Sequence, residues 1–178
     1  MPVAGADAVI VTTSKKATGL RHPPVFLNGA GEKITHRAVS QAPSLTSGPL
    51  KPSIARALAQ AGTRVQDIDF LSLYDCYTIM VATTIEDAGL CGAGKFGEWL
   101  RDNGGMSANA RQPVNTHGGQ LGFGQPDLAG GMTHVVEAVR QIRGTAHNRQ
   151  IKNCQSALVT GNGATMSEAV ALVLGADL

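Results

Sequence analysis

The sequence predicts a single α/β domain with a mixed or parallel β-sheet. Short apolar runs rich in β-branched residues alternate with amphipathic segments of helical period, an order typical of α/β folds. Apolar residues make up 43% of the chain and charged residues 16%, which indicates a globular protein rather than a disordered one. The 178 residues suit one domain with a core of its own.

The first half of the chain predicts three strands and three helices. The strands are 5–13 (GADAVIVTT), 24–31 (PVFLNGAG) and the apolar end of 65–74 (VQDIDFLSLY); the helices are 14–20, 50–62 and 78–90. The helix at 50–62 is the clearest, because Ile54, Leu58 and Ala61 share one face and Gly62 follows the last of them. The segment 78–90 is apolar enough to be a largely buried helix.

The second half begins with a polar insertion near 91–112, which contains one short helix around 96–103. A glycine-rich loop at 112–126 precedes a long amphipathic helix at 127–144. The predicted apolar face of this helix comprises Leu128, Met132, Val135, Val139 and Ile142. Two apolar strands joined by a glycine-rich turn end the chain at 156–175.

Composition excludes several classes of function. The formal charge of +2 and the scattered basic residues argue against nucleic-acid binding. Cys76, Cys91 and Cys154 are too irregularly spaced for a disulfide framework or a zinc site. The sequence shows no secretory signal and no apolar run long enough to span a membrane, so we expect a cytoplasmic protein.

Three junctions carry reactive or glycine-rich residues: the first junction, 74–78 (YDCYT), the second, 115–126 (NTHGGQLGFGQP), and the third, 160–167 (TGNGATMS). Each follows or joins predicted strands, where α/β proteins place their sites, so we expect the three to meet. Glycines there let the backbone approach a ligand closely. Tyr74, Asp75, Cys76, Tyr77 and His117 are the acid–base or nucleophilic candidates.

Each candidate also has a structural interpretation. Cys76 is of a type that often serves as a small buried apolar residue. Asp75 is expected to cap the helix that follows it, which is the interpretation the sequence favours. His117 can be a hydrogen-bonded loop residue, and His134, inside the long helix, is expected to be a satisfied or surface histidine.

The order and spacing of YDCYT, NTHGGQLGFGQPDLAGG, a long helix and ALVTGNGATMSEAVALVLG resemble the C-terminal half of the thiolase superfamily. The likeness is to its sterol-carrier-protein and lipid-transfer branch, and it covers nearly the whole chain. It implies one half of a thiolase fold over residues 1–178, with three layers, a mixed sheet and helices on both faces.

The first motif of that branch is HDCF, where ordinary thiolases have NEAF. The resemblance places Tyr74 at the oxyanion-hole position, Asp75 on the acid and Cys76 on a cysteine proposed as an acid or base. Tyrosine at this position resembles the steroid side-chain aldolases. That likeness implies retro-aldol cleavage of a β-hydroxyacyl-CoA by a phenol, and a partner built from a zinc ribbon and an OB-fold.

The other motifs match with departures. Asn115, Gly118 and Gly119 match the family's N-x-x-GG, and Gly161 and Gly163 match glycines of its third motif, which lacks its cysteine here. Gln125 replaces the histidine that activates the nucleophile in thiolases. Glutamine cannot accept a proton from a thiol, which argues against thiolysis, but its amide can still donate a hydrogen bond to an oxyanion.

Together these features predict a thiolase-like subunit or fragment that makes or breaks a carbon–carbon bond in an acyl-CoA thioester. The predicted catalytic residues are Tyr74, Cys76, His117 and Gln125, and the predicted substrate-binding residues are Asn115, Gly118, Gly119, Gly161 and Gly163. Coenzyme A enters as part of the substrate, with no bound cofactor or metal expected.

Two alternatives stay open. One is a non-catalytic subunit that stabilises a catalytic partner. The other is a truncated piece of a longer polypeptide, because the family's nucleophilic cysteine lies in an N-terminal half. Either way, we expect an oligomer in which segment 78–90 and the helix beginning at Leu128 contact a thiolase N-terminal half or a partner chain.

Overall fold

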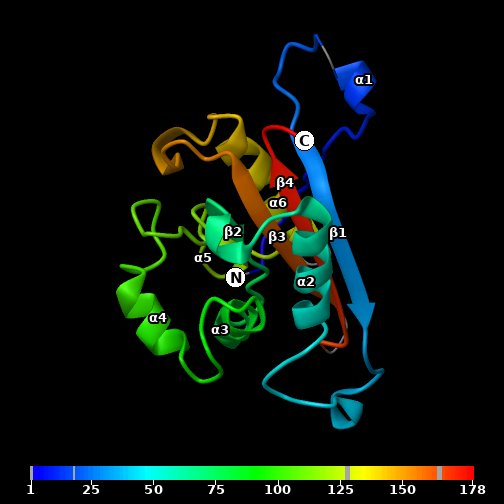
Figure 1. Cartoon of the computed structure of the whole chain (residues 1–178), viewed down its shortest axis with the longest axis vertical. Coiled ribbons are helices and arrows are strands. Elements are labelled where there is room, and N and C mark those ends of the chain that lie inside the picture. Colours follow the sequence, from blue (N-terminus) through cyan, green and yellow to red (C-terminus); the bar gives the residue numbers. More distant parts are fainter. Residues whose placement is uncertain (1, 18, 127–128, 164–165) are drawn as a thin grey trace.

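A computed structural model describes residues 2–17, 19–126, 129–163 and 166–178 and contains one four-stranded sheet. Its strands are β1 (Phe26–Ile34), β2 (Phe70–Ser72), β3 (Ser156–Gly163) and β4 (Glu168–Gly175). They lie in the order β1-β4-β3-β2 (Figure 1). β2 and β3 are parallel, whereas β4 is antiparallel to both of its neighbours, so the sheet is mixed.

Helices cover both faces of this sheet. The helices are α1 (Ser14–Ala17), α2 (Leu50–Ala61), α3 (Thr78–Asp87), α4 (Phe96–Asp102), α5 (Gly119–Gly122) and α6 (Gly130–Ile142). α2 packs on β1 and β4, on the near side of the strands in Figure 1, and α6 packs on β2 and β3 from the other side. The three-layer α/β architecture predicted from the sequence is therefore confirmed.

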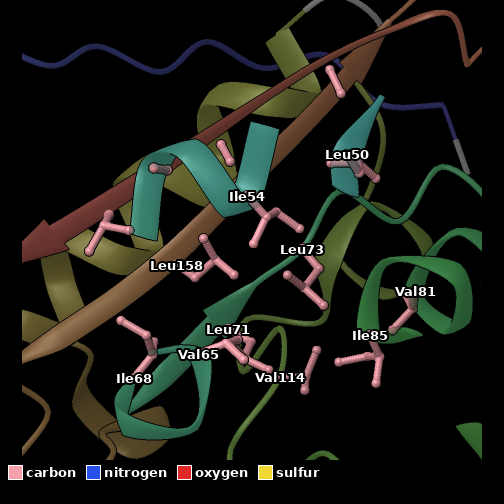
Figure 2. Close-up of a cluster of buried hydrophobic side chains, with 14 of the residues drawn as sticks. Leu50, Ile54, Val65, Ile68, Leu71, Leu73, Val81, Ile85, Val114 and Leu158 are labelled. Atoms are coloured by element: carbon pink, nitrogen blue, oxygen red, sulfur yellow. The ribbon is translucent and has the colours of Figure 1, made fainter. Parts of the chain in front are cut away.

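The two faces of the sheet hold two apolar clusters, because successive strand residues point in opposite directions. Leu71 joins α2 and α3 in the larger cluster, whereas its neighbour Phe70 packs toward α6 in the smaller one. Figure 2 shows the larger cluster, in which side chains from α2, α3, β2 and β3 point toward one another. This cluster lies directly beneath the end of β2, where the first junction begins.

The contact between β1 and α2 depends on two glycines. A Cβ atom at Gly29 would collide with the carbonyl oxygen of Ala57, and one at Gly31 would collide with that of Ser53. Both obstacles are helix backbone, which cannot move aside as a flexible side chain can. The two glycines therefore set how closely α2 approaches the sheet.

Replacing Gly31 with alanine is expected to lower the free energy of unfolding by about 2 kcal/mol, because the added methyl group forces α2 away from β1. For a domain of this size, the melting temperature should fall by roughly 4–8 °C. Gly48→Ala is the control, since an added Cβ there meets nothing within 4 Å. Equal melting temperatures for Gly31→Ala and the parent chain would contradict the role of this contact.

The N-terminal strand prediction is wrong for this structure. Residues 5–13 are extended but belong to none of the described strands, and the side chains of Ile10 and Val11 are 96% and 89% exposed. A β-branched segment forms a strand only when it pairs with the edge of a sheet. Among the described residues, no strand pairs with residues 5–13. The helix predicted at 14–20 is the single turn α1.

Three members of the predicted apolar face of α6 lie inside the protein: Ile142 belongs to the smaller apolar cluster, and Val135 and Val139 pack against it. Leu128 lies outside the described residues, and Met132 is exposed. A second buried side, which was not predicted, carries His134, Glu137 and Gln141.

The remaining elements agree with their predictions more closely. α2, α3, α4, β3 and β4 lie within the predicted segments, and the turn before β2 is the 3-10 helix Val65–Asp67. The loop predicted at 112–126 contains α5, which was not expected. Across the parts of the chain that the structure describes, every helix is too short or too polar to cross a bilayer.

Candidate active site

The first and second junctions are joined through Asn115. Its side-chain amide accepts a hydrogen bond from the Leu73 N–H (2.7 Å) and donates one to the Leu73 carbonyl oxygen (2.8 Å). Val114 forms a β-bridge with Leu71, so the second junction starts as a continuation of the sheet beside β2. The amide of Asn115 thus fixes the backbone at the end of β2, and its contact with substrate stays a prediction.

Asp75 ties the two junctions together a second time. Its carboxylate accepts hydrogen bonds from the backbone N–H groups of Gln120 (2.7 Å) and Leu121 (3.3 Å), in the first turn of α5. Gly119 gives the carboxylate room, because a Cβ there would collide with it. Asp75 is therefore a helix cap, but the prediction that it caps the helix following it, α3, is wrong.

His134 lies behind Asp75 with 0% of its surface exposed, so its interpretation as a surface residue is wrong. Its Nε2 is 3.4 Å from Asp75 Oδ1, and its Nδ1 is 3.1 Å from the hydroxyl of Ser72. A serine and a carboxylate thus flank the two ring nitrogens, but on the opposite nitrogens from those they occupy in the catalytic triad of hydrolases. Ser72 is fully buried and cannot reach a substrate, so the alignment connects β2, α6 and the first junction structurally.

The carboxylate of Asp75 is held in its charged form. Burial alone would raise its pKa, but the neighbouring His134 ring and the hydrogen bonds from the N–H groups of Gln120 and Leu121 outweigh burial, and the net pKa lies below the usual value. A fixed negative charge therefore lies between Tyr74 and Cys76 in the chain.

Tyr74 is in contact with all the other junctions. Its backbone N–H donates to the hydroxyl of Thr160 in the third junction (3.1 Å), and its own hydroxyl oxygen accepts from Nε2 of Gln125 in the second (3.5 Å). The phenol ring lies between the His134 ring, with centroids 6.1 Å apart, and Gly131. The residue that replaces the thiolase histidine is thus the one that contacts the phenol oxygen.

Cys76 is half-buried, and burial raises the pKa of its thiol, an effect opposed in part by a hydrogen bond with Asn162 of the third junction. At neutral pH the group is a thiol and not a thiolate, because the ordinary thiol pKa already lies above 7. Cys76 in this structure can therefore give up a proton, but it is not an activated nucleophile.

His117 stands edge-on to His134, with ring centroids 5.1 Å apart. Burial, reinforced by the neighbouring His134, lowers the pKa of His117 to about 4, so its ring is neutral at pH 7. Neither ring nitrogen has a hydrogen-bond partner among the described residues, although both are buried. The alternative of a hydrogen-bonded loop histidine is not supported by these contacts.

This burial predicts a pH dependence of stability. The folded-state pKa of His117, about 4, lies below the ordinary histidine value of 6.5, so the unfolded chain binds more protons between these two values. Stability is therefore lost as the pH falls from 6.5 toward 4, by roughly 3 kcal/mol for this residue. Urea unfolding at pH 7 and pH 4.5 should show a smaller loss in His117→Gln than in the parent. An equal loss of stability in His117→Gln and in the parent would contradict the assignment of this pH dependence to His117.

A buried network beneath the second junction was not predicted. Glu137 accepts a hydrogen bond from the Thr116 hydroxyl (2.9 Å) and forms an ion pair with Arg149 (2.9 Å), while Gln141 donates to both Thr116 and Glu137. These bonds fix Thr116, which immediately precedes His117. The sequence does contain the signal, because His134, Glu137 and Gln141 repeat at helical spacing on one side of α6.

The predicted glycines lie at the same place. Gly118 has a left-handed φ of 101° at the start of α5, and Gly161 and Gly163 end β3 beside Asn162. All the predicted site residues belong to the three junctions by their sequence positions, and their contacts with a substrate stay predictions. Within the described ranges, no group of three or more His, Cys, Asp or Glu side chains is placed to hold a metal ion.

The surroundings of the site are apolar. A cavity of about 340 Å³ adjoins Asn162, and its apolar lining comes from Val39, Leu45, Leu50, Met80 and Met166. Large apolar side chains are also exposed around the junctions, with Tyr77 67% and Phe123 65% accessible. The expected contact surface thus includes Tyr77 at the start of α3.

Comparison with known proteins decides the family. Residues 31–176 match the family described as "Thiolase C-terminal domain-like". The chain belongs to this family. The resemblance found in the three motifs is thereby confirmed, and the mixed sheet with helices on both faces is the architecture of this thiolase-like domain.

Relatives of this thiolase-like domain include two bacterial proteins. A "Steroid side-chain-cleaving aldolase" of Thermomonospora curvata is 36% identical over 97% of this chain and 44% of its own length. A "17-hydroxy-3-oxo-4-pregnene-20-carboxyl-CoA lyase" of Mycobacterium tuberculosis is 33% identical over 96% of this chain and 44% of its own length. The chain therefore spans less than half the length of these relatives.

Solved structures agree with the family. An "Ltp2-ChsH2(DUF35) aldolase" superimposes with a TM-score of 0.81 and 31% identity, covering 92% of this chain and 42% of that one. A monomeric SCP2-thiolase-like protein from Mycobacterium smegmatis has a TM-score of 0.61 at 19% identity, over 86% of this chain and 29% of that one. The second likeness concerns the fold alone.

Proposed function

We propose that this thiolase-like domain belongs to an aldolase that cleaves a carbon–carbon bond in a β-hydroxyacyl-CoA, with Tyr74 as the catalytic base. The observation that carries this proposal is the contact of the Tyr74 hydroxyl with the Gln125 amide, at the point where the junctions meet. Two relatives are named as an aldolase and a CoA lyase, which supports the same class of reaction and a CoA thioester as substrate.

The reaction is a proton transfer coupled to bond cleavage. The oxygen of Tyr74, reacting as the phenolate, accepts the proton of the substrate's β-hydroxyl group and becomes the phenol, the β-carbon becomes a carbonyl, and the bond between the α- and β-carbons breaks. Its electron pair is received by the thioester as an enolate, which is then protonated at the α-carbon. The Cys76 thiol, protonated at neutral pH, and the neutral ring of His117 are the groups we assign to the enolate.

Two observations favour this reaction over thiolysis. Gln125 cannot accept a proton from a nucleophilic thiol as the thiolase histidine does, and the Cys76 thiol is not activated. Retro-aldol cleavage needs neither of these functions. It needs a base beside a hydrogen-bond donor, which Tyr74 and Gln125 provide.

The proposed enzyme is completed by a second part. We propose that a thiolase N-terminal half, or a partner chain, covers the exposed apolar side chains around the junctions, including Tyr77, Ile79 and Phe123. We assign the acyl portion of the substrate to the apolar cavity beside Asn162. A zinc-ribbon and OB-fold partner, an oligomeric assembly and a cytoplasmic location belong to the same proposal.

The test is an assay of the assembled enzyme with a β-hydroxyacyl-CoA, in the presence and absence of free coenzyme A. Retro-aldol cleavage yields a carbonyl compound and a shorter acyl-CoA without any added thiol, so both products should form in equal amounts in its absence. A strict requirement for free coenzyme A with a β-ketoacyl-CoA would indicate thiolysis and contradict the proposal. Analysis of co-purifying chains by mass identifies the second part.

A further inference from the structure

Gly130, the first residue of α6, has no role in the reaction described so far, yet it is the residue against which Gln125 is packed. A Cβ atom at position 130 would collide with Oε1 of Gln125 and lie 2.9 Å from Nε2 of Gln120. The carboxamide of Gln125 therefore occupies the space that any side chain at position 130 would fill.

The Oε1 end of the Gln125 amide lies beside Gly130, as does Nε2 of the almost fully buried Gln120, and neither atom has a hydrogen-bond partner among the described residues. The missing side chain at position 130 therefore leaves the space in which Oε1 of Gln125 lies. The observed orientation leaves Nε2 of Gln125 facing the Tyr74 oxygen at 3.5 Å.

The backbone of Gln125 is held as well. Its carbonyl oxygen accepts a hydrogen bond from the N–H of Val3 (3.3 Å), and the Val3 side chain fills the space beside Gly124, where a Cβ would lie 2.7 Å from it. The backbone contact with Val3 and the space beside Gly130 together hold the side chain of Gln125 in its observed position. A larger residue at 130 would deny it that position.

We propose that Gly130 is a positioning residue: the absence of a side chain there seats the Gln125 carboxamide so that its N–H group points at the Tyr74 oxygen. This inference rests on the proposed function, in which that oxygen accepts the substrate's proton. A hydrogen-bond donor favours the deprotonated form of an oxygen acid, which is the form a base requires. Gly130 acts only through Gln125 and does not touch the substrate.

The experiment is a double-mutant cycle of Gly130→Ala and Gln125→Ala, with Gly131→Ala as the matched control. A Cβ at Gly131 would lie 3.8 Å from the Tyr74 ring, an ordinary contact, although it is the same change one residue further along the same helix. Gly130→Ala should lower the melting temperature. Adding Gln125→Ala should restore it, because removing the carboxamide frees the space. Gly131→Ala should not lower it, since alanine favours a helix.

A second readout follows the phenol itself. The chain has two tyrosines, so a Tyr77→Phe background leaves Tyr74 as the single one, and its ¹³Cζ resonance reports on the hydroxyl group alone. Gly130→Ala should shift this resonance in the same direction as Gln125→Ala, and it should add no further shift once Gln125 is alanine. In the assembled enzyme, kcat should fall about a hundredfold for Gly130→Ala and for Gln125→Ala, with KM little changed. A loss of this size is usual when one hydrogen-bond donor to a catalytic oxyanion is removed.

The outcomes separate this inference from the proposed function. An unshifted Tyr74 resonance in Gly130→Ala, or a further shift of equal size in the Gln125→Ala background, overturns the positioning role. If the resonance and the melting temperatures behave as expected but turnover is independent of Tyr74, the positioning role stands and the proposed reaction fails.

Discussion

Replacing Tyr74 with phenylalanine is expected to lower the rate of carbon–carbon cleavage by about two to four orders of magnitude, the usual contribution of a general base. The substitution removes the oxygen that contacts Gln125 and that we assign to the substrate's proton, while the ring retains its packing beside His134 and Gly131. The loss should therefore appear in kcat with the melting temperature nearly unchanged. Steady-state kinetics of the assembled enzyme measures it.

Tyr77→Phe is the matched control for this substitution, because it removes the same hydroxyl group three residues along the same junction. Tyr77 is 67% exposed and its hydroxyl is given no role in the reaction, so the stability of the isolated chain and the turnover of the assembled enzyme should both change little. Full activity in Tyr74→Phe would remove the phenol from the mechanism. Full activity after joint replacement of Tyr74, Cys76 and His117 would favour the alternative, a non-catalytic subunit that stabilises a partner.

Replacing Asp75 with alanine is expected to lower the free energy of unfolding by about 3–5 kcal/mol, the cost of breaking a buried charged contact by removing one partner. The change leaves the N–H groups of Gln120 and Leu121 without their acceptor and His134 without its carboxylate. It also releases α5, which connects His117 to Gln125. Denaturant unfolding measures the loss in stability, and hydrogen exchange of α5 localises it.

The sign of the pH dependence provides a further check on Asp75. The folded-state pKa of Asp75 lies below the usual value. Its contribution to the free energy of unfolding is therefore fully present above the unfolded-state pKa, about 3.9, and is lost as the pH falls through the lower folded-state pKa. The difference between the parent and Asp75→Ala should therefore be largest near neutral pH and shrink in strong acid. Asp67→Ala is the control, since this carboxylate forms an exposed pair with Arg64 and should change the unfolding midpoint little. A difference that persists unchanged in strong acid would contradict the assigned charge.

Much of the candidate site was predictable because its residues are contiguous with strong local signals. The apolar run that ends at Tyr74 is β2, and the glycines of the second and third junctions lie where the chain turns. The expectation that the three junctions meet is confirmed by the contacts of Tyr74 with Gln125 and Thr160. The catalytic roles of these residues stay predictions.

The errors share a physical origin in contacts between distant parts of the chain. Residues 5–13 have the composition of a strand, but pairing with a sheet edge, not composition, makes a strand. Asp75 has the position of a cap for α3, but the N–H groups that it accepts from belong to α5, 45 residues away. His134 has the polarity of a surface residue, but Asp75 and Ser72 satisfy part of that polarity inside the protein.

The sequence by itself determined the alternation of strands and helices, the three junctions and the replacement of the thiolase histidine by Gln125, because periodicity, glycine content and residue identity are local properties. Only the tertiary structure decided which polar groups are buried together and which way each one points. The position of Gln125 illustrates the difference: its identity is written in the chain, but the space that its amide occupies is left by Gly130, the first residue of α6. Such orientation arises from steric exclusion and hydrogen-bond complementarity, which exist only once the elements are packed.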